Sequence, residues 1–146
     1  MTYEKLKLEN QLCFPVYAAS RLITREYQPF LDGIGITYPQ YLVLMVLWEN
    51  DNLPVNDIAK KLILKTNTIT PLLKRIEHLG LIIRTRSAED ERKVLVQLTE
   101  KGLELQVKAA QIPDELVKRL SNSEIELEDL LKLKKSLNSI ISVLSK

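Results

Sequence analysis

Residues 65–80 read KTNTITPLLKRIEHLG, a polar first turn followed by apolar residues at helical spacing. This pattern predicts a helix that Thr66 or Asn67 caps and that runs to His78, where a nearby glycine stops it. A shorter helix is expected just before it, over residues 54–62, with its apolar side chains facing inward. Two short helices joined by a tight connection, the second beginning with polar residues, are typical of a helix-turn-helix.

The chain after this helix changes to strand-like segments. Residues 81–86 and 93–98 are rich in Ile and Val, and the charged residues 87–92 separate them. This pattern predicts a β-hairpin with a long polar tip. A helix-turn-helix followed by such a hairpin, or wing, predicts a mainly α fold of the winged helix-turn-helix class, with the hairpin as its small β element.

Positive charge is concentrated in the middle of the chain, although the net charge of all 146 residues is only +2. Between Lys60 and Lys93 there are nine basic and four acidic residues, so this segment carries +5 and the rest carries −3. A basic centre between neutral or acidic ends indicates that the middle of the chain meets a polyanion. The alternative is that these charges only solvate a surface hairpin. The ordered set of helix, turn, helix and basic hairpin favours DNA.

Short hydroxyl and amide side chains at the start of the second helix can reach base edges, while lysine and arginine farther along suit backbone phosphates. Basic side chains on the wing can enter or flank a minor groove. The residues expected to contact DNA are Lys65, Thr66, Asn67, Thr68, Thr70, Pro71, Lys74 and Arg75 on the helix, and Arg84, Arg86, Arg92 and Lys93 on the wing.

The N-terminal stretch from about Leu6 to Leu31 has apolar residues at helical spacing, so a long helix is expected there. Pro15 lies inside this stretch. A proline there either kinks the helix near Gln11 or marks the start of its regular part, and the sequence leaves both open. After a glycine-containing break, Thr37 is expected to cap a buried central helix with Pro39 in its first turn.

Thr99 is expected to cap the helix after the wing, and residues 123–126, Ser-Glu-Ile-Glu, match a capping box for the last helix. Apolar residues of the last helix recur at alternating steps of three and four, and they are Leu130, Leu133, Leu137, Ile140 and Leu144. Such a stripe predicts pairing with a second copy across a dimer, the alternative being packing within its own subunit. We therefore divide one compact fold into an N-terminal dimerisation helix (1–36), a winged helix-turn-helix (37–98) and C-terminal dimerisation helices (99–146).

Other classes of protein fit the sequence poorly. Its apolar stretches are far shorter than the roughly 20 residues that span a bilayer, and no secretion signal is recognisable, so a cytoplasmic location without membrane contact is expected. The one cysteine, Cys13, cannot form an intramolecular disulfide or a multi-cysteine metal site, and neither a metal nor a cofactor is expected. An enzyme with Cys13 as nucleophile and His78 as base is disfavoured, because no phosphate loop or carboxylate pair accompanies them.

Several motifs together resemble a known family. Asp90-x-Arg92, followed by Leu98-Thr99 and Gly102, is similar to the wing-to-helix signature of the MarR family of transcriptional regulators. The motifs that resemble its organic-hydroperoxide-sensing, one-cysteine OhrR-like branch are Leu12-Cys13-Phe14 with Tyr17, Thr37-Tyr38-Pro39-Gln40-Tyr41 and Thr70-Pro71-Leu72-Leu73-Lys74-Arg75. The resemblance implies an obligate homodimer with intertwined N- and C-terminal helices, a wing stabilised by Asp90 and Arg92, and binding to a pseudo-palindromic operator of double-stranded DNA.

The resemblance also implies a role for the thiol. In this reading an organic hydroperoxide oxidises Cys13, whose sulfur is held by Tyr17 one turn farther along and by Tyr27 and Tyr38 of the other subunit. Without a second cysteine, the sulfenic acid must continue to a mixed disulfide with a low-molecular-weight thiol, a cyclic sulfenamide or overoxidation. Oxidation is then expected to make a repressor release its operator. Two alternatives stay open. Either Cys13 is an inert apolar residue, or the regulator responds to a small aromatic ligand and Cys13 is not the sensor.

Overall fold

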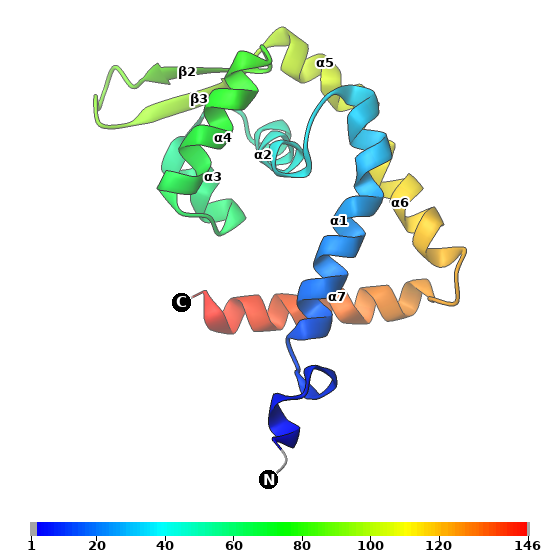
Figure 1. Ribbon diagram of the computed structural model, residues 1–146. Coiled ribbons are helices and arrows are strands. Elements are labelled where there is room, and N and C mark those ends of the chain that lie inside the picture. Colours follow the sequence, from blue (N-terminus) through cyan, green and yellow to red (C-terminus); the bar gives the residue numbers. More distant parts are fainter. Residues whose placement is uncertain (1–2, 146) are drawn as a thin grey trace.

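A computed structural model describes residues 3–145, in which helices surround a small three-stranded antiparallel sheet (Figure 1). The predicted class, mainly α with a β-hairpin wing, is confirmed. Within these residues no single helix is long and apolar enough to cross a membrane, and α1 with α2 meet that test only as a pair bent by 73°. In chain order the elements are η1 (Glu4–Leu6), η2 (Leu8–Asn10), α1 (Phe14–Ile34), α2 (Tyr38–Glu49), β1 (Leu53–Pro54), α3 (Val55–Leu62), α4 (Thr66–His78), β2 (Ile82–Arg86), β3 (Val94–Leu98), α5 (Glu100–Ala109), α6 (Ile112–Ser121) and α7 (Leu127–Leu144).

The first long helix, α1, begins at Phe14. Pro15 occupies its first turn, where a missing N–H costs little, so the helix starts here rather than running through the proline with a kink. Residues 4–10 form two 3₁₀ turns instead, so of the two possibilities that the sequence left open the structure has the helix that begins beside Pro15. Gly35 ends α1 with a φ of 76°, a left-handed conformation that favours glycine.

The central helix, α2, is closed at its N-terminus by a capping box. The backbone N–H of Thr37 donates to Gln40 Oε1 at 2.9 Å, and the N–H of Gln40 donates to Thr37 Oγ1 at 3.4 Å. The helix is apolar nearly all round because it lies inside the core, where Leu44 is fully buried. Near its end, Trp48 Nε1 donates to the carbonyl oxygen of Gly102 at 2.9 Å, which connects α2 to α5.

The three strands pair in the order β1-β3-β2. β2 and β3 form the predicted hairpin, with Ile82 opposite Leu98. β1 was not predicted, because a segment of two residues that includes Pro54 shows no strand periodicity. It pairs with β3, and Asp51 Oδ1 just before it accepts a hydrogen bond from the N–H of Leu98 at 2.9 Å. The strand thus joins the helix-turn-helix to the base of the wing.

The helix after the wing, α5, begins at the predicted cap. Thr99 Oγ1 accepts from the N–H of Gly102 at 3.1 Å and donates to the carbonyl of Gly80 at 2.6 Å. A Cβ atom on Gly102 would lie 2.2 Å from the carbonyl oxygen of Leu81, so no larger residue fits. Glycine in this signature therefore allows α5 to pass close to the start of the wing.

The predicted cap of α4 is wrong by one or two residues. The connection from α3 passes through Ile63 in the left-handed region, with a φ of 57°, and this brings Lys65 to the N-cap. The Lys65 side chain makes no capping hydrogen bond. Thr66 and Asn67 lie inside the helix instead, so their side chains are free to face outward.

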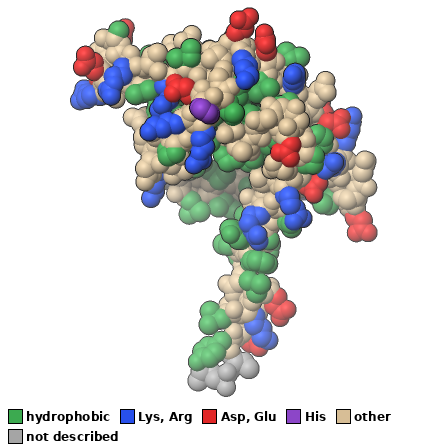
Figure 2. Space-filling view, turned by 45° about the horizontal axis from the view of Figure 1, so that its top comes forward, with side chains coloured by type: hydrophobic (Ala, Val, Ile, Leu, Met, Phe, Trp, Pro, Cys, Tyr) green, Lys and Arg blue, Asp and Glu red, His purple; other side chains and the backbone are tan. Residues whose placement is uncertain are grey.

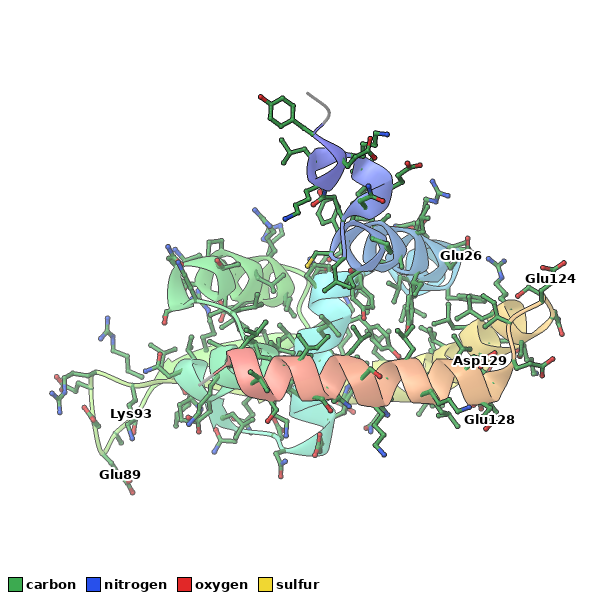
Figure 3. The ribbon with its side chains drawn as sticks, turned by 90° about the horizontal axis from the view of Figure 1, so that it is seen from below. Glu26, Glu89, Lys93, Glu124, Glu128 and Asp129 are labelled. Carbon is green, nitrogen blue, oxygen red and sulfur yellow. The ribbon has the colours of Figure 1, made fainter. Side chains whose placement is uncertain are left out.

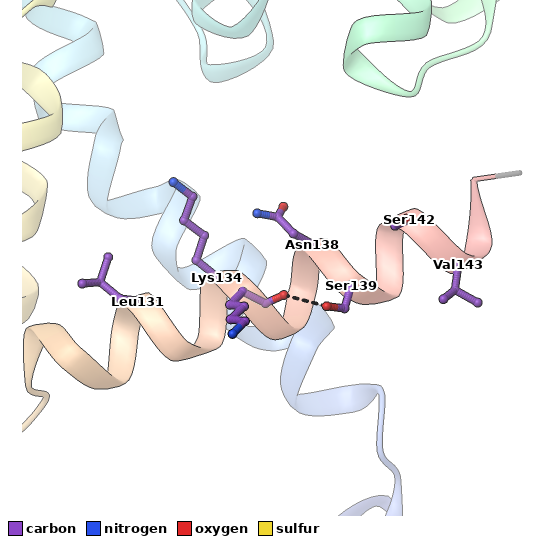
Figure 4. Close-up of a pocket in the computed structure, with 7 residues that line it drawn as sticks. Leu131, Lys134, Asn138, Ser139, Ser142 and Val143 are labelled. Atoms are coloured by element: carbon purple, nitrogen blue, oxygen red, sulfur yellow. Dashed lines mark hydrogen bonds between the residues drawn. The ribbon is translucent and has the colours of Figure 1, made fainter.

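The last helix, α7, also begins later than predicted. Ser123 does not cap it: its hydroxyl donates to the carbonyl of Leu120 at the end of α6, and the helix starts after Glu126. α7 overlaps α1 in the view of Figure 1, but Figure 3 shows the two helices apart, and no residue of α7 is buried. The shallow hollow in Figure 4 is lined by α7 residues alone, so it is an open helix face rather than a ligand pocket.

Candidate DNA interface and thiol site

One face of α4 is polar and exposed because the opposite face is held in the core. Ile69, Leu73 and Ile76 are fully buried, and α4 contacts α2, α3 and β2. Thr70 is half-buried, and its hydroxyl donates to the carbonyl of Thr66 at 2.9 Å. The predicted DNA-contacting residues of α4 that are exposed are Lys65, Thr66, Asn67, Thr68, Pro71, Lys74 and Arg75. The structure therefore brings this set to one end and one side of the helix.

A groove separates the start of α4 from the wing. Its polar lining comes from three elements and consists of Asn56, Asp57, Thr66, Thr70, Arg84, Arg92 and Lys93. Figure 2 shows lysine and arginine side chains gathered over the wing and the adjoining helix. Acidic side chains lie at the end of the molecule opposite the wing, where Figure 3 labels Glu26, Glu124, Glu128 and Asp129. Figure 3 also labels Glu89 on the wing, so the separation of charge in space is partial.

The wing tip is a turn closed by local hydrogen bonds. Asp90 Oδ1 accepts from the backbone N–H of Arg92 at 3.1 Å and from its Nε at 3.3 Å. The N–H of Lys93 donates to the carbonyl of Asp90 at 2.9 Å, and the N–H of Ser87 donates to the carbonyl of Lys93 at 2.9 Å. The Arg92 side chain is nevertheless 92% exposed, so its guanidinium points into solvent with donors to spare. Arg86 lies exposed on the adjoining strand and donates to the carbonyl of Glu91 at 3.0 Å.

Arg84 differs from the other basic residues of the wing. Its Nη2 lies 3.0 Å from Oε1 of Glu77 on α4, and its side chain is only 22% exposed. The hydrogen bonds from Arg84 hold the pKa of the Glu77 carboxyl below its usual value, so this group stays ionised at neutral pH. The sequence pointed to Arg84 as a DNA contact but did not single out Glu77, because the two lie on different elements and no local pattern pairs them.

Cys13 lies at the N-cap of α1 and is exposed. Its carbonyl accepts from the N–H of Tyr17 at 3.0 Å, and the Tyr17 ring, also exposed, lies under the Arg21 guanidinium at 4.7 Å. Cys13 and Tyr17 are thus neighbours in one chain, as their spacing predicts.

Tyr27 and Tyr38 lie together in a separate aromatic cluster. Their ring centroids are 4.9 Å apart, and Tyr41 follows at 6.3 Å from Tyr38. Burial, aided by the neighbouring tyrosines, raises the pKa of Tyr27 to about 12, so its hydroxyl remains a proton donor at neutral pH. Cys13 precedes Tyr27 by 14 residues, about 21 Å along a helix axis. The cluster is therefore remote from Cys13 of its own chain.

The sequence of this chain is similar to those of known transcriptional regulators. Residues 25–108 match the family model described as transcriptional regulator SarA/Rot. The organic hydroperoxide resistance transcriptional regulator of Bacillus subtilis (strain 168) is 49% identical over 142 residues, which cover 97% of this chain and 95% of that protein. The chain belongs to the MarR family of transcriptional regulators. Within that family it belongs to the OhrR-like branch.

Solved structures of AbfR from Staphylococcus epidermidis share the fold of this MarR-family chain. Reduced AbfR bound to DNA has 34% sequence identity and a TM-score of 0.79, with all of both chains covered. Overoxidised AbfR bound to DNA has 37% identity and a TM-score of 0.72, covering 97% of this chain and 99% of that one. Regulators of this family are dimeric and are not enzymes, which agrees with the class predicted from the sequence.

Proposed function

We propose that this MarR-family regulator is a homodimeric repressor that binds a pseudo-palindromic operator and releases it when an organic hydroperoxide oxidises Cys13. The observation that carries the proposal is an exposed cysteine at the N-terminus of α1, in the same chain as a polar helix edge and a basic wing. The repressor would act in the cytoplasm.

The DNA contacts divide by chemistry. Thr66, Asn67 and Thr68 at the exposed start of α4 are suited to base edges in a major groove, whereas Lys74 and Arg75 are suited to phosphates. Arg92, held at the wing tip by Asp90 but extended into solvent, is suited to the adjacent minor groove. Two such units on one homodimer would read two half-sites, and DNA-bound AbfR supports this mode of binding.

Two reactants act in turn on the Cys13 sulfur, a hydroperoxide and then a thiol. The Cys13 thiolate attacks the O–O bond of the hydroperoxide, which yields the sulfenic acid and an alkoxide that takes up a proton. A low-molecular-weight thiol then displaces water from the sulfenic acid and leaves a mixed disulfide. Tyr27 and Tyr38 of the second subunit would donate hydrogen bonds to the reduced sulfur.

The mixed disulfide is the form that we propose to release DNA. Overoxidised AbfR is found bound to DNA, so overoxidation does not by itself prevent binding in that relative. A bulky adduct on Cys13 would instead separate the start of α1 in one subunit from the tyrosine cluster of the other, and would rotate the two winged units relative to each other. Both units then lose simultaneous contact with two major grooves.

The test uses a duplex selected from a random pool by the reduced protein. Wild type treated with one equivalent of cumene hydroperoxide and then cysteine should lose DNA affinity, and intact mass should show one added cysteine. Cys13→Ser should bind the same duplex normally and ignore the treatment. Unchanged affinity of the fully adducted wild type would reject the proposal, and failure of reduced Cys13→Ser to bind would indicate a structural cysteine.

A second candidate effector is a small aromatic molecule, with Cys13 incidental. The observation that favours it is an apolar hollow between α2 and the α5–α6 junction, lined in part by Tyr41, Met45, Trp48 and Pro113. Such a ligand would dissociate wild type and Cys13→Ser from DNA equally. Because Trp48 is the one tryptophan of the chain, its fluorescence would report occupancy directly.

A further inference from the structure

Glu77 and Arg84 make a connection between α4 and the wing that is independent of the covalent turn. Glu77 Oε1 accepts from Arg84 Nη2 at 3.0 Å and from Nε at 3.3 Å. Its other oxygen, Oε2, accepts from the backbone N–H of Arg84 at 2.8 Å. Both carboxylate oxygens are thus occupied by one residue of β2.

The backbone hydrogen bond shows what this pair does to the strand. β2 is an edge strand, since the sheet order is β1-β3-β2. The N–H of Arg84 points away from β3 and is bound by the carboxylate from α4. The base of the wing is also held by the bond from Leu81 N–H to the carbonyl of Ile76 at 3.3 Å. A second attachment three residues farther out restricts bending of the hairpin about that base.

The pair also removes Arg84 from the pool of charges available to DNA. Its guanidinium donates to Glu77 through Nε and Nη2, and the two side chains are 22% and 35% exposed. A phosphate contact would have to compete with this charge-assisted pair for the guanidinium. Arg92, in contrast, is almost fully exposed. The nominal charge of Arg84 therefore adds little to DNA affinity directly.

We propose that Glu77 and Arg84 are positioning residues that hold the wing at the angle at which Arg92 and Lys93 reach DNA, and that Arg84 is not itself a DNA contact. This inference rests on the proposed DNA binding. It assigns an acidic residue near the DNA surface a favourable role. Simple electrostatics gives the opposite sign, because removing a negative charge near DNA should strengthen binding.

The experiment measures DNA affinity of the full-length reduced protein on the selected duplex. Glu77→Ala should weaken binding by about five- to tenfold because it loses all three bonds to Arg84, and Arg84→Lys should weaken it in the same direction because it keeps only the backbone bond and loses both guanidinium bonds. The double variant Glu77→Ala/Arg84→Ala should bind no more weakly than Glu77→Ala alone, since loss of the carboxylate already breaks all three bonds of the connection. Circular dichroism melting should show every variant folded at the assay temperature.

Glu89→Ala is the matched control, because Glu89 is an exposed acidic residue at the wing tip (Figure 3). It should leave affinity unchanged or slightly raised. Tighter binding by folded Glu77→Ala, or wild-type affinity of Arg84→Lys, would overturn the inference and make Arg84 an ordinary phosphate contact. Neither result would touch the proposed function, which fails only if the wild-type protein does not bind duplex DNA or does not respond at Cys13.

Discussion

Tyr27 is a weaker acid than an ordinary tyrosine. Burial raises its pKa from the ordinary value of 10.0 to about 12, and burial raises the pKa values of Tyr38 and Tyr41 as well. A neutral hydroxyl is what a hydrogen bond to a thiolate requires. Burial of the cluster therefore keeps its hydroxyl groups protonated at neutral pH.

This acidity predicts a pH dependence of stability. Below pH 10 the folded and unfolded chains both hold the Tyr27 proton, and the contribution of this residue is fully present. Between pH 10 and 12 the unfolded chain loses a proton that the folded chain keeps, so stability falls as the pH rises. When each Tm is compared with the same protein's value at pH 7, Tyr27→Phe should show a shallower decline above pH 10 than wild type. An identical alkaline decline in both proteins would contradict the assignment.

At the scale of elements, the connection between α3 and α4 carries local strain. Ile63 adopts a φ of 57°, a conformation that is costly for a β-branched residue, and it is 59% exposed. Its N–H donates to the carbonyl of Lys60 at 3.2 Å, so the turn is held by backbone bonds rather than by the side chain. The helix-turn-helix thus keeps its angle at some cost in stability.

Ile63→Asn should stabilise the protein by about 1 kcal/mol, because asparagine tolerates the left-handed region and little apolar burial is lost. Thermal or denaturant unfolding measures the change. Ile83→Asn is the control, since Ile83 is similarly exposed on β2 but does not have a positive φ. That variant should gain nothing and lose a little strand propensity. Equal effects at both positions would show that the turn is unstrained.

The elements differ in how far sequence could predict them. The helix-turn-helix, the hairpin and the Thr37 and Thr99 caps were predictable because periodicity and capping are local properties. β1 escaped because two residues show no period, and the Ser123 capping box failed because that hydroxyl bonds to the end of the preceding helix. The Glu77–Arg84 pair escaped for a third reason: it depends on how a strand folds back against a helix, which local pattern does not encode.

At the scale of the whole molecule, apolar surface on α1, α7 and the N-terminal turns has no partner within the described chain. Leu6 and Leu12 are 76% and 87% exposed, and Ile140 of α7 is 51% exposed. The turns that carry Leu6 are nevertheless fixed by bonds such as that from Asn10 Nδ2 to the carbonyl of Glu4 at 2.7 Å. Ordered residues that expose apolar side chains in this way fit pairing with a second copy of the chain, in agreement with a dimeric family.

If the apolar stripe of α7 holds the dimer together, a charge on it should weaken the dimer and, with it, binding to a duplex that carries two half-sites. Ile140→Glu should raise the dimer dissociation constant at least about tenfold, measured by sedimentation. Its affinity for the two-half-site duplex should fall about a hundredfold or more, because the second contact is no longer intramolecular. Ser139→Glu introduces the same charge on the polar face of α7 (Figure 4) and should leave both quantities near wild type. A stable dimer of Ile140→Glu would place the interface elsewhere. It would also remove α7 from the mechanism by which oxidation of Cys13 changes DNA binding.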